Sequence, residues 1–114
     1  LQTIKSSTHS TCISLAASFG AVILAACDKR SALEPSSIMI HQPLIPEGIG
    51  GKETEISILA KDLSQTRKTI AKILSKHTGK SIKQIEKDIE NDRYMNAEEA
   101  IKYGIADTII DSEV

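Results

Sequence analysis

Residues 11–26 read TCISLAASFGAVILAA, and this stretch decides the fold that we expect for the chain. Residues 11–15 favour a short buried strand, because they include β-prone and apolar side chains. Residues 18–26 are small and aliphatic, which favours a buried helix. Ser18 therefore lies at a junction between a strand and a helix.

Such a junction gives Ser18 the surroundings that a nucleophilic serine requires. Its hydroxyl can project from the first helical turn, where the backbone N–H groups have no partner within the helix. Those N–H groups and the positive end of the helix dipole stabilise a negative charge beside the serine, and they would form half of an oxyanion hole. A serine that is only small enough to let a helix approach a sheet would give the same sequence.

The same stretch also resembles an export signal. Lys5 precedes the apolar run, and residues 24–27 (LAAC) end it as in a bacterial lipoprotein signal with Cys27 lipidated. However, the residues between Lys5 and Ile13 are rich in Ser and Thr, where a signal is hydrophobic. The run is also shorter than the ~20 residues that span a bilayer as a helix. We therefore expect a folded domain, and a lipid on Cys27 would revive the export interpretation.

Length and composition indicate a small single domain. The chain has 114 residues and a formal net charge of −1, without a long run of one sign, so neither nucleic acid nor a membrane is an expected partner. Two tyrosines, one phenylalanine and no tryptophan leave little for base stacking. Cys12 and Cys27 lie in apolar surroundings, which favours buried free thiols over a disulfide.

The rest of the chain predicts a second strand, an arm and several helices. Residues 36–40 favour a strand after a polar turn at 28–31, and a strand, a helix and a second strand predict a largely parallel sheet. Residues 44–52 contain a proline and three glycines and are expected to form an extended arm. Further helices are expected at 53–77, 82–90 and 97–103, and a closing strand is expected at 105–110. The expected N-caps are Ser81, with a capping box, and Asn96. The expected C-caps are Gly79 and Gly104.

The predicted helix 53–77 is longer than the core of a small domain can cover. Its apolar side chains form one stripe and its lysines lie off that stripe. We therefore expect part of the stripe to contact another subunit.

Ser18, His41 and Asp92 are the candidate catalytic residues. Ser18 would attack a carbonyl carbon, and His41 would take its proton and return it to the leaving group. Asp92 would hold the imidazole in the required tautomer and stabilise its charged form. A histidine hydrogen-bonded within the fold and a solvated aspartate are the alternative interpretations of the last two.

Five motifs occur in the order seen in the ClpP family, the proteolytic subunits of the ATP-dependent Clp protease. They are AASFG at 16–20, IMIHQP at 38–43, HTGKS at 77–81, DRYMNAEEA at 92–100 and YGIAD at 103–107. The chain therefore resembles this family over essentially its whole length.

The resemblance implies an α/β fold, a ClpP/crotonase-like stack of β-β-α units with a protruding handle helix. The N-terminal part of the family fold would be lacking. Residues 1–43 would form the part of the head with the nucleophile and the base. Residues 44–79 would be the handle arm and helix, and residues 80–114 the part of the head with the acid.

The resemblance also assigns roles to individual residues. Ser18 matches the family nucleophile, His41 the general base and Asp92 the orienting acid. The backbone N–H of Phe19 matches one oxyanion donor, at a position where the family usually has Met. The handle residues that would line the substrate path are Leu44, Gly48, Gly50 and Gly51.

The function implied by the resemblance is that of a serine endopeptidase subunit in a compartmentalised, ATP-dependent protease that degrades unfolded proteins to short peptides. Its partners would be other ClpP-type subunits in stacked seven-membered rings, an AAA+ unfoldase that uses the ATP, and a chain that supplies the N-terminal part with the second oxyanion donor. No cofactor and no metal are expected in this chain. Frequent Ile and Lys and the lacking front favour the plastid (chloroplast) stroma, with the bacterial cytoplasm as the alternative.

Two departures from the family pattern affect these expectations. The arm is longer than usual and contains Pro46, which cannot donate a backbone hydrogen bond to an extended substrate. Asn91 stands where the family commonly has an arginine that forms ion pairs between rings. Two other functions are kept as alternatives. One is a structural or regulatory subunit whose site is unassembled because the part with the second oxyanion donor is lacking, and the other, more distant, is a crotonase-type acyl-CoA enzyme on the related fold.

Overall fold

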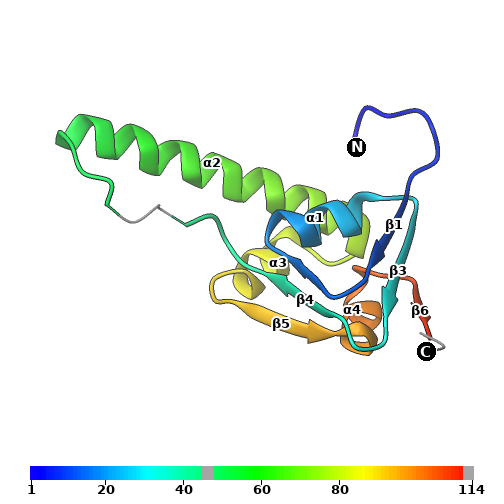
Figure 1. Cartoon of the computed structure of the whole chain (residues 1–114). Coiled ribbons are helices and arrows are strands. Elements are labelled where there is room, and N and C mark those ends of the chain that lie inside the picture. The colour runs from blue at the N-terminus through cyan, green and yellow to red at the C-terminus, as the bar shows by residue number, and fades with distance from the viewer. Residues whose placement is uncertain (45–47, 112–114) are drawn as a thin grey trace.

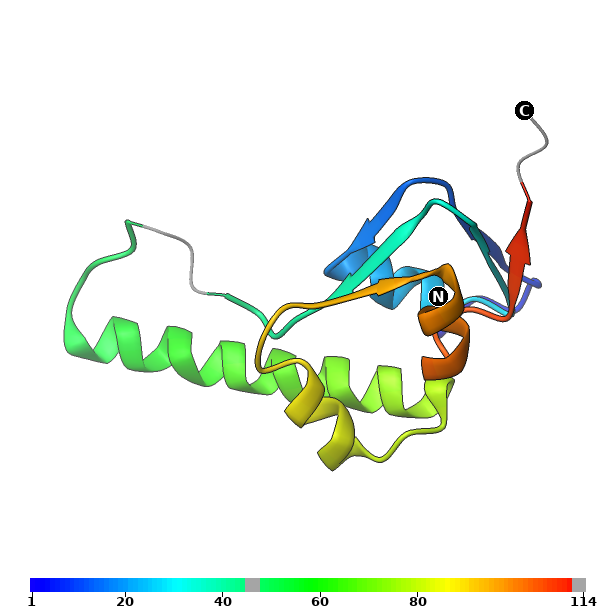
Figure 2. The ribbon, with the colours of Figure 1, turned by 90° about the horizontal axis from the view of Figure 1, so that it is seen from below.

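The structure is a computed structural model, and it describes residues 1–44 and 48–111. A head carries one long helix, α2, whose first turns project away from it (Figure 1). Figure 2 shows these first turns on the opposite side of the head from the last strand, β6. The elements are β1 (His9–Cys12), β2 (Leu15–Ala17), α1 (Phe19–Ala26), β3 (Lys29–Leu33), β4 (Ser37–Ile40), α2 (Glu53–Thr78), α3 (Ile82–Asp88), β5 (Arg93–Asn96), α4 (Ala97–Tyr103) and β6 (Thr108–Ile110).

The strands form two three-stranded sheets within the described residues, in the orders β1-β3-β6 and β2-β4-β5. The pairs β1-β2 and β3-β4 each place their first strand in the first sheet and their second strand in the second sheet, whereas β5 lies in the second sheet and β6 in the first. A helix, α1, then returns the chain so that β3 pairs with β1 and β4 with β2, both in parallel. β6 joins β3 in parallel and β5 joins β4 antiparallel. The expected α/β fold of β-β-α units with a protruding helix is confirmed.

Two local predictions were wrong. The single strand expected at 11–15 is divided into β1 and β2, because the chain bends at Ile13 and Ser14 and enters the second sheet. The polar turn expected at 28–31 is mostly strand β3. Its polar side chains are tolerated because Arg30, the most polar of them, finds partners elsewhere in the fold.

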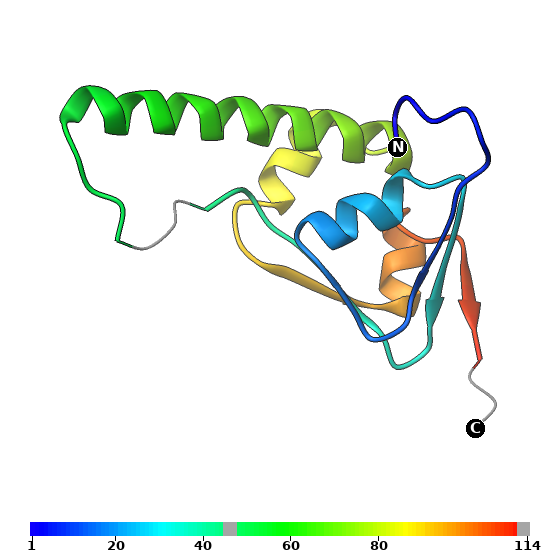
Figure 3. The ribbon, with the colours of Figure 1, turned by 45° about the horizontal axis from the view of Figure 1, so that its top comes forward.

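The core lies between the two sheets and the helices, and α1 lies between α2 and the strands (Figure 3). The largest fully buried side chains of this core are Ile38, Ile40, Leu74, Ile85, Ile89 and Ile105. Only the C-terminal part of α2 contributes to it, through Ile70, Ala71 and Leu74. Ile56 is exposed near the free end of α2. That another subunit covers this part of the stripe stays a prediction.

The predicted caps explain where the helices begin and end. Asn96 accepts from the N–H of Glu99 at 2.8 Å and donates its own N–H to the Glu99 carboxylate at 3.2 Å, which is a complete capping box. Ser81 accepts from the N–H of Gln84 at 3.2 Å. The capping box expected there is incomplete, because the Gln84 side chain instead donates to Asp88. α3 ends at Asp88, two residues earlier than expected, and β6 is three residues shorter than the predicted strand.

Arg30 on β3 binds the C-terminal ends of three helices. Its Nη1 donates to the carbonyl oxygens of Ala25 at 3.2 Å, His77 at 3.0 Å and Gly104 at 2.7 Å. Its Nε donates to the Asp107 carboxylate at 3.1 Å, and Nη2 pairs with the same group. This hydrogen bonding to Arg30 lowers the pKa of Asp107. The guanidinium thus meets the partial negative charge at three helix ends.

Replacing Gly104 by alanine is expected to lower the free energy of unfolding by about 2 kcal/mol or more. Gly104 has φ +99°, and a Cβ there would lie 2.7 Å from the backbone oxygen of Thr78. Gly79→Ala is the matched control, because Gly79 has φ +78° with no atom within 4 Å of the added Cβ. For this control we expect the free energy of unfolding to fall by about 1 kcal/mol. Urea-induced unfolding of the assembled protein measures the stability of both variants. Equal losses of unfolding free energy would contradict a clash between the added Cβ and the Thr78 backbone.

Candidate active site

The three candidate residues lie at one edge of the sheet β2-β4-β5. Ser18 directly follows β2, His41 directly follows β4, and Asp92 directly precedes β5. β2 runs parallel to the central strand β4, so both strands end at the same edge. β5 runs antiparallel to β4 and therefore begins at that edge. The topology thus brings together residues that are far apart in the sequence.

The register of β4 and β5 places His41, the candidate base, opposite Asp92, the candidate acid. The last pair in this antiparallel ladder is Ile40 with Arg93. The next residues outward are His41 and Asp92. Residues directly opposite each other across two antiparallel strands have Cβ atoms about 5 Å apart. The backbone therefore gives Asp92 the position from which it can orient His41.

Ser18 has a strained backbone conformation. Its φ is 58° and its ψ −120°, and within residues 1–44 and 48–111 it alone among non-glycine residues has a positive φ. Its N–H donates to the carbonyl of Met39 on β4 at 2.9 Å, and its carbonyl accepts from Ala21 and Val22 in α1. The side chain makes no capping hydrogen bond, and no partner for Oγ lies among the described residues. A strained turn from strand to helix that presents a free serine hydroxyl is the geometry of a nucleophile elbow.

The N–H of Phe19 is available to an oxyanion. Phe19 is the first residue of α1, and in the described parts of the chain its N–H donates to no backbone carbonyl. Phe19 itself is 60% exposed. This arrangement fits the donor role predicted for Phe19.

His41 is half-buried and already has one ring nitrogen engaged. Its Nδ1 donates to the carbonyl oxygen of Gln42. A carbonyl oxygen only accepts, so Nδ1 is the donor in this contact, and in the neutral imidazole this tautomer leaves the lone pair of Nε2 available, as a general base requires. The N–H of Gln42 in turn donates to Ile89 at 2.7 Å, and its side chain donates to the carbonyl of Glu90 at 3.2 Å. The residue after His41 is therefore hydrogen-bonded to the turn that precedes Asp92.

The side chains of the three residues are not joined in this structure. Among the described residues, no hydrogen bond connects His41 to Ser18 or to Asp92, and Asp92 is exposed. The Nδ1–H that an orienting acid would accept is used by Gln42. The backbone thus brings the three candidate residues to one edge of the sheet. A hydrogen bond from His41 to Asp92 would require the imidazole to rotate away from Gln42.

A cavity of about 450 Å³ begins directly after His41, between the start of the arm and α2. It is lined by Gln42, Pro43, Leu44, Ala60, Leu63, Ser64 and Arg67. Of the predicted arm residues, Leu44 lines this cavity, whereas Gly48, Gly50 and Gly51 are exposed and do not. Pro46 lies outside the described residues.

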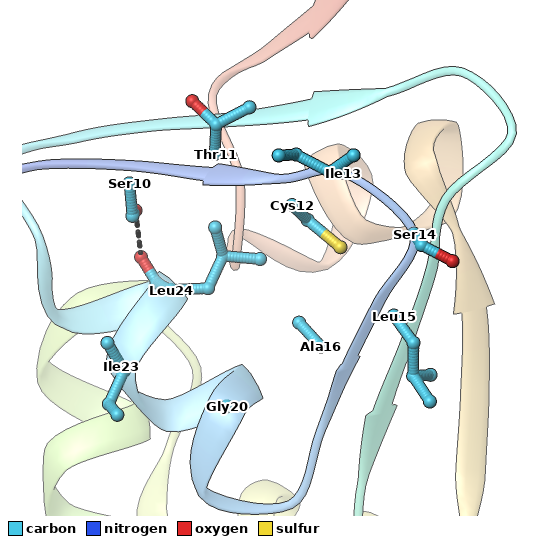
Figure 4. Close-up of a pocket in the computed structure, with 10 residues that line it drawn as sticks. All are labelled: Ser10, Thr11, Cys12, Ile13, Ser14, Leu15, Ala16, Gly20, Ile23 and Leu24. Atoms are coloured by element: carbon cyan, nitrogen blue, oxygen red, sulfur yellow. Dashed lines mark hydrogen bonds between the residues drawn. The ribbon is translucent and has the colours of Figure 1, made fainter.

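A second cavity, of about 410 Å³, lies along β1, β2 and α1 (Figure 4). Ile13 and Leu15 are 70% and 61% exposed on its strand side, and Ile23 is exposed on its helix side. Ser10 on β1 donates to the carbonyl of Leu24 on α1 at 3.1 Å. Within the described residues β1 and β2 each pair with a neighbour on one side only, so both sheets have an open edge here.

Several contacts near the candidate site are not indicated by the sequence. The hydrogen bonds of Gln42 with His41, Ile89 and Glu90 were not predicted. Asp88 and Tyr103 were also missed, because no local pattern indicates that their side chains meet.

Fold and site geometry together describe an α/β protein of β-β-α units with a serine at a strained elbow. The Clp protease family model matches residues 1–113 of this chain. The chain therefore belongs to the Clp protease family, and the resemblance found in its motifs is confirmed. At the level of the family it is a ClpP-type peptidase, a class whose subunits assemble with one another and with Clp ATPases.

Two kinds of feature are absent from residues 1–44 and 48–111. No helix in these ranges combines the length and the hydropathy that crossing a membrane requires. No group of three or more His, Cys, Asp or Glu side chains in the same ranges is arranged to hold a metal ion.

Proposed function

We propose that this chain is a serine endopeptidase subunit of a compartmentalised, ATP-dependent protease that degrades unfolded polypeptides to short peptides. The observation that carries this proposal is the strained Ser18 at the start of α1, with His41 and Asp92 at the same edge of the sheet. Family membership supports the peptidase class.

The chemistry follows from the positions of the three residues. Ser18 Oγ attacks the carbonyl carbon of a peptide bond while His41 Nε2 takes the hydroxyl proton. The N–H of Phe19 donates to the oxyanion that forms. His41 then returns the proton to the departing amine as the C–N bond breaks. Water releases the acyl group from Ser18 by the same sequence, with Asp92 orienting the imidazole throughout.

The proposed assembly uses the surfaces that this chain leaves exposed. Other ClpP-type subunits, identical or different, would form stacked seven-membered rings, and α2 would contact them through its exposed end. An AAA+ unfoldase would use ATP and deliver unfolded polypeptide. The open edge at β1 and β2 would receive a further β-β-α segment, from the same polypeptide or from another chain, that supplies the second oxyanion donor. The plastid stroma is the proposed compartment, with the bacterial cytoplasm as the alternative.

One observation favours a second candidate function. Because Nδ1 of His41 is bonded to Gln42 and not to Asp92, a subunit in which this arrangement persists would be structural or regulatory. Such a subunit would build the ring without hydrolysing peptides.

Labelling with a fluorophosphonate separates these candidates. We expect the assembled protease to carry a phosphonyl group on Ser18, identified by mass spectrometry of its peptides. Ser18→Ala and His41→Ala should abolish this label, whereas Ser7→Ala, at an exposed serine near the N-terminus, should retain it. An intact ring without label on Ser18 would overturn the peptidase proposal and support the structural subunit. Acyl-CoA turnover without serine labelling would instead support the crotonase alternative.

A further inference from the structure

Three elements meet at the carboxylate of Asp88, close in sequence to the candidate acid. Tyr103, at the end of α4, donates its hydroxyl to Asp88 Oδ2 at 2.6 Å. Gln84 on α3 donates its side-chain amide to Oδ1 at 2.8 Å. Arg93, the first residue of β5, places Nη1 3.7 Å from Oδ1. The Asp88 side chain is only 9% exposed, so these contacts replace water around it.

The ring of Tyr103 adds contacts to the same cluster. The Arg93 guanidinium carbon lies 5.2 Å from the centroid of this ring, and Lys80 Nζ lies 4.7 Å from it. Cations at such distances over a tyrosine ring are attracted to its face. Burial, together with the hydrogen bond to Asp88, raises the pKa of Tyr103 well above its usual value. The phenol is therefore protonated throughout the neutral pH range and can donate to Asp88 there.

Asp88 and Arg93 are the two residues that flank segment 89–92, which ends in Asp92. Their ion pair joins the two ends of this segment. Between them, Ile89 is fully buried, and the carbonyls of Ile89 and Glu90 accept hydrogen bonds from Gln42, the residue after His41. Within the described residues the Asp92 side chain itself makes no hydrogen bond. The backbone of segment 89–92 therefore sets the point from which this carboxylate extends.

We propose that Tyr103 and Asp88 are positioning residues that hold segment 89–92 so that Asp92 faces His41. The inference rests on the proposed function, because it assigns the acid role to Asp92. Neither residue touches the substrate. They act by fixing the two ends of segment 89–92. Because the segment is already ordered, the Asp92 carboxylate can bind the His41 imidazole without a further loss of backbone entropy.

The test is Tyr103→Phe in the assembled protease, with kcat and KM measured on a short peptide substrate. This change removes the hydroxyl that donates to Asp88 and keeps the ring. We expect kcat to fall about tenfold while KM stays within twofold, because a small misplacement of a catalytic group affects the chemical step. Tyr94→Phe is the matched control, since Tyr94 lies exposed on β5, and it should leave both constants within twofold.

The effect must also depend on Asp92. In an Asp92→Ala background, Tyr103→Phe is expected to cause no further loss of kcat, because residues that act through one another are not additive. Equal losses in both backgrounds would identify a purely structural role and overturn the inference, as would an unchanged kcat in the Tyr103→Phe enzyme. If Tyr103→Phe does not assemble, Asp88→Asn is measured in the same way and judged by the same outcomes.

This experiment distinguishes the inference from the proposed function on which it rests. Ser18 labelling of the wild-type assembly is measured first. Its absence would overturn the proposed function and the positioning role together. A labelled wild-type enzyme whose kcat does not depend on Tyr103 would overturn the positioning role alone.

Discussion

Replacing Ser18 by glycine is expected to lower kcat/KM of the assembled protease by a factor of about 10⁴ or more and, at the same time, to stabilise the fold by about 1 kcal/mol. The activity is lost because the attacking oxygen is removed. The stability rises because Ser18 has φ 58° and ψ −120°, a conformation that costs a side-chain-bearing residue energy and that glycine adopts readily.

Ser18→Ala is the matched variant for this experiment. It removes the same oxygen but keeps a Cβ in the strained conformation, so activity should fall equally without the gain in stability. Peptide hydrolysis and urea-induced unfolding of the same preparations measure both effects. Retained hydrolysis in either variant would contradict the assignment of Ser18 as the nucleophile. Equal stability of the two variants would contradict backbone strain at position 18.

Arg30→Met is expected to lower the free energy of unfolding by about 3–5 kcal/mol. The Arg30 side chain is only 12% exposed, and methionine would leave the carbonyls of three helix ends and the Asp107 carboxylate without their shared donor. Buried acceptors that lose their partner carry the full cost of desolvation. The loss should therefore reach α1, α2 and α4 together.

Two control variants identify the cause of this loss. Lys29→Met changes an exposed side chain on the same strand and should cost less than about 0.5 kcal/mol. Arg30→Lys keeps the charge but lacks the planar fork of donors, so we expect an intermediate loss. Urea-induced unfolding of the assembled protein checks all three, and an Arg30→Met variant as stable as Lys29→Met would contradict the role of Arg30.

The helices could be predicted from the sequence because their signals are local. Each of the caps Ser81, Asn96, Gly79 and Gly104 lies within a few residues of the backbone groups that it satisfies. These caps mark the start of α3, both ends of α4 and the end of α2. Strand β3 could not be predicted, because its polar residues are typical of a turn. Arg30 is accommodated there by Asp107, which is 77 positions away in sequence.

The site was only partly predictable for the same reason. The pattern at residues 11–26 indicated that Ser18 lies between a strand and a helix, as the structure has it. That His41 and Asp92 reach the same edge depends on the register of β4 with β5, which no local pattern encodes and which only the family resemblance implied. The contact of His41 with Gln42 was not predictable at all, because it depends on a side-chain rotation.

The most direct test of the catalytic assignment is the structure of the assembled protease after reaction with a fluorophosphonate. We predict phosphorus bonded to Ser18 Oγ, the His41 ring turned away from Gln42 with Nε2 facing the adduct, and Nδ1 hydrogen-bonded to the Asp92 carboxylate. An adduct on a different residue, or an adduct on Ser18 with the Asp92 carboxylate remote from the imidazole, would contradict the triad.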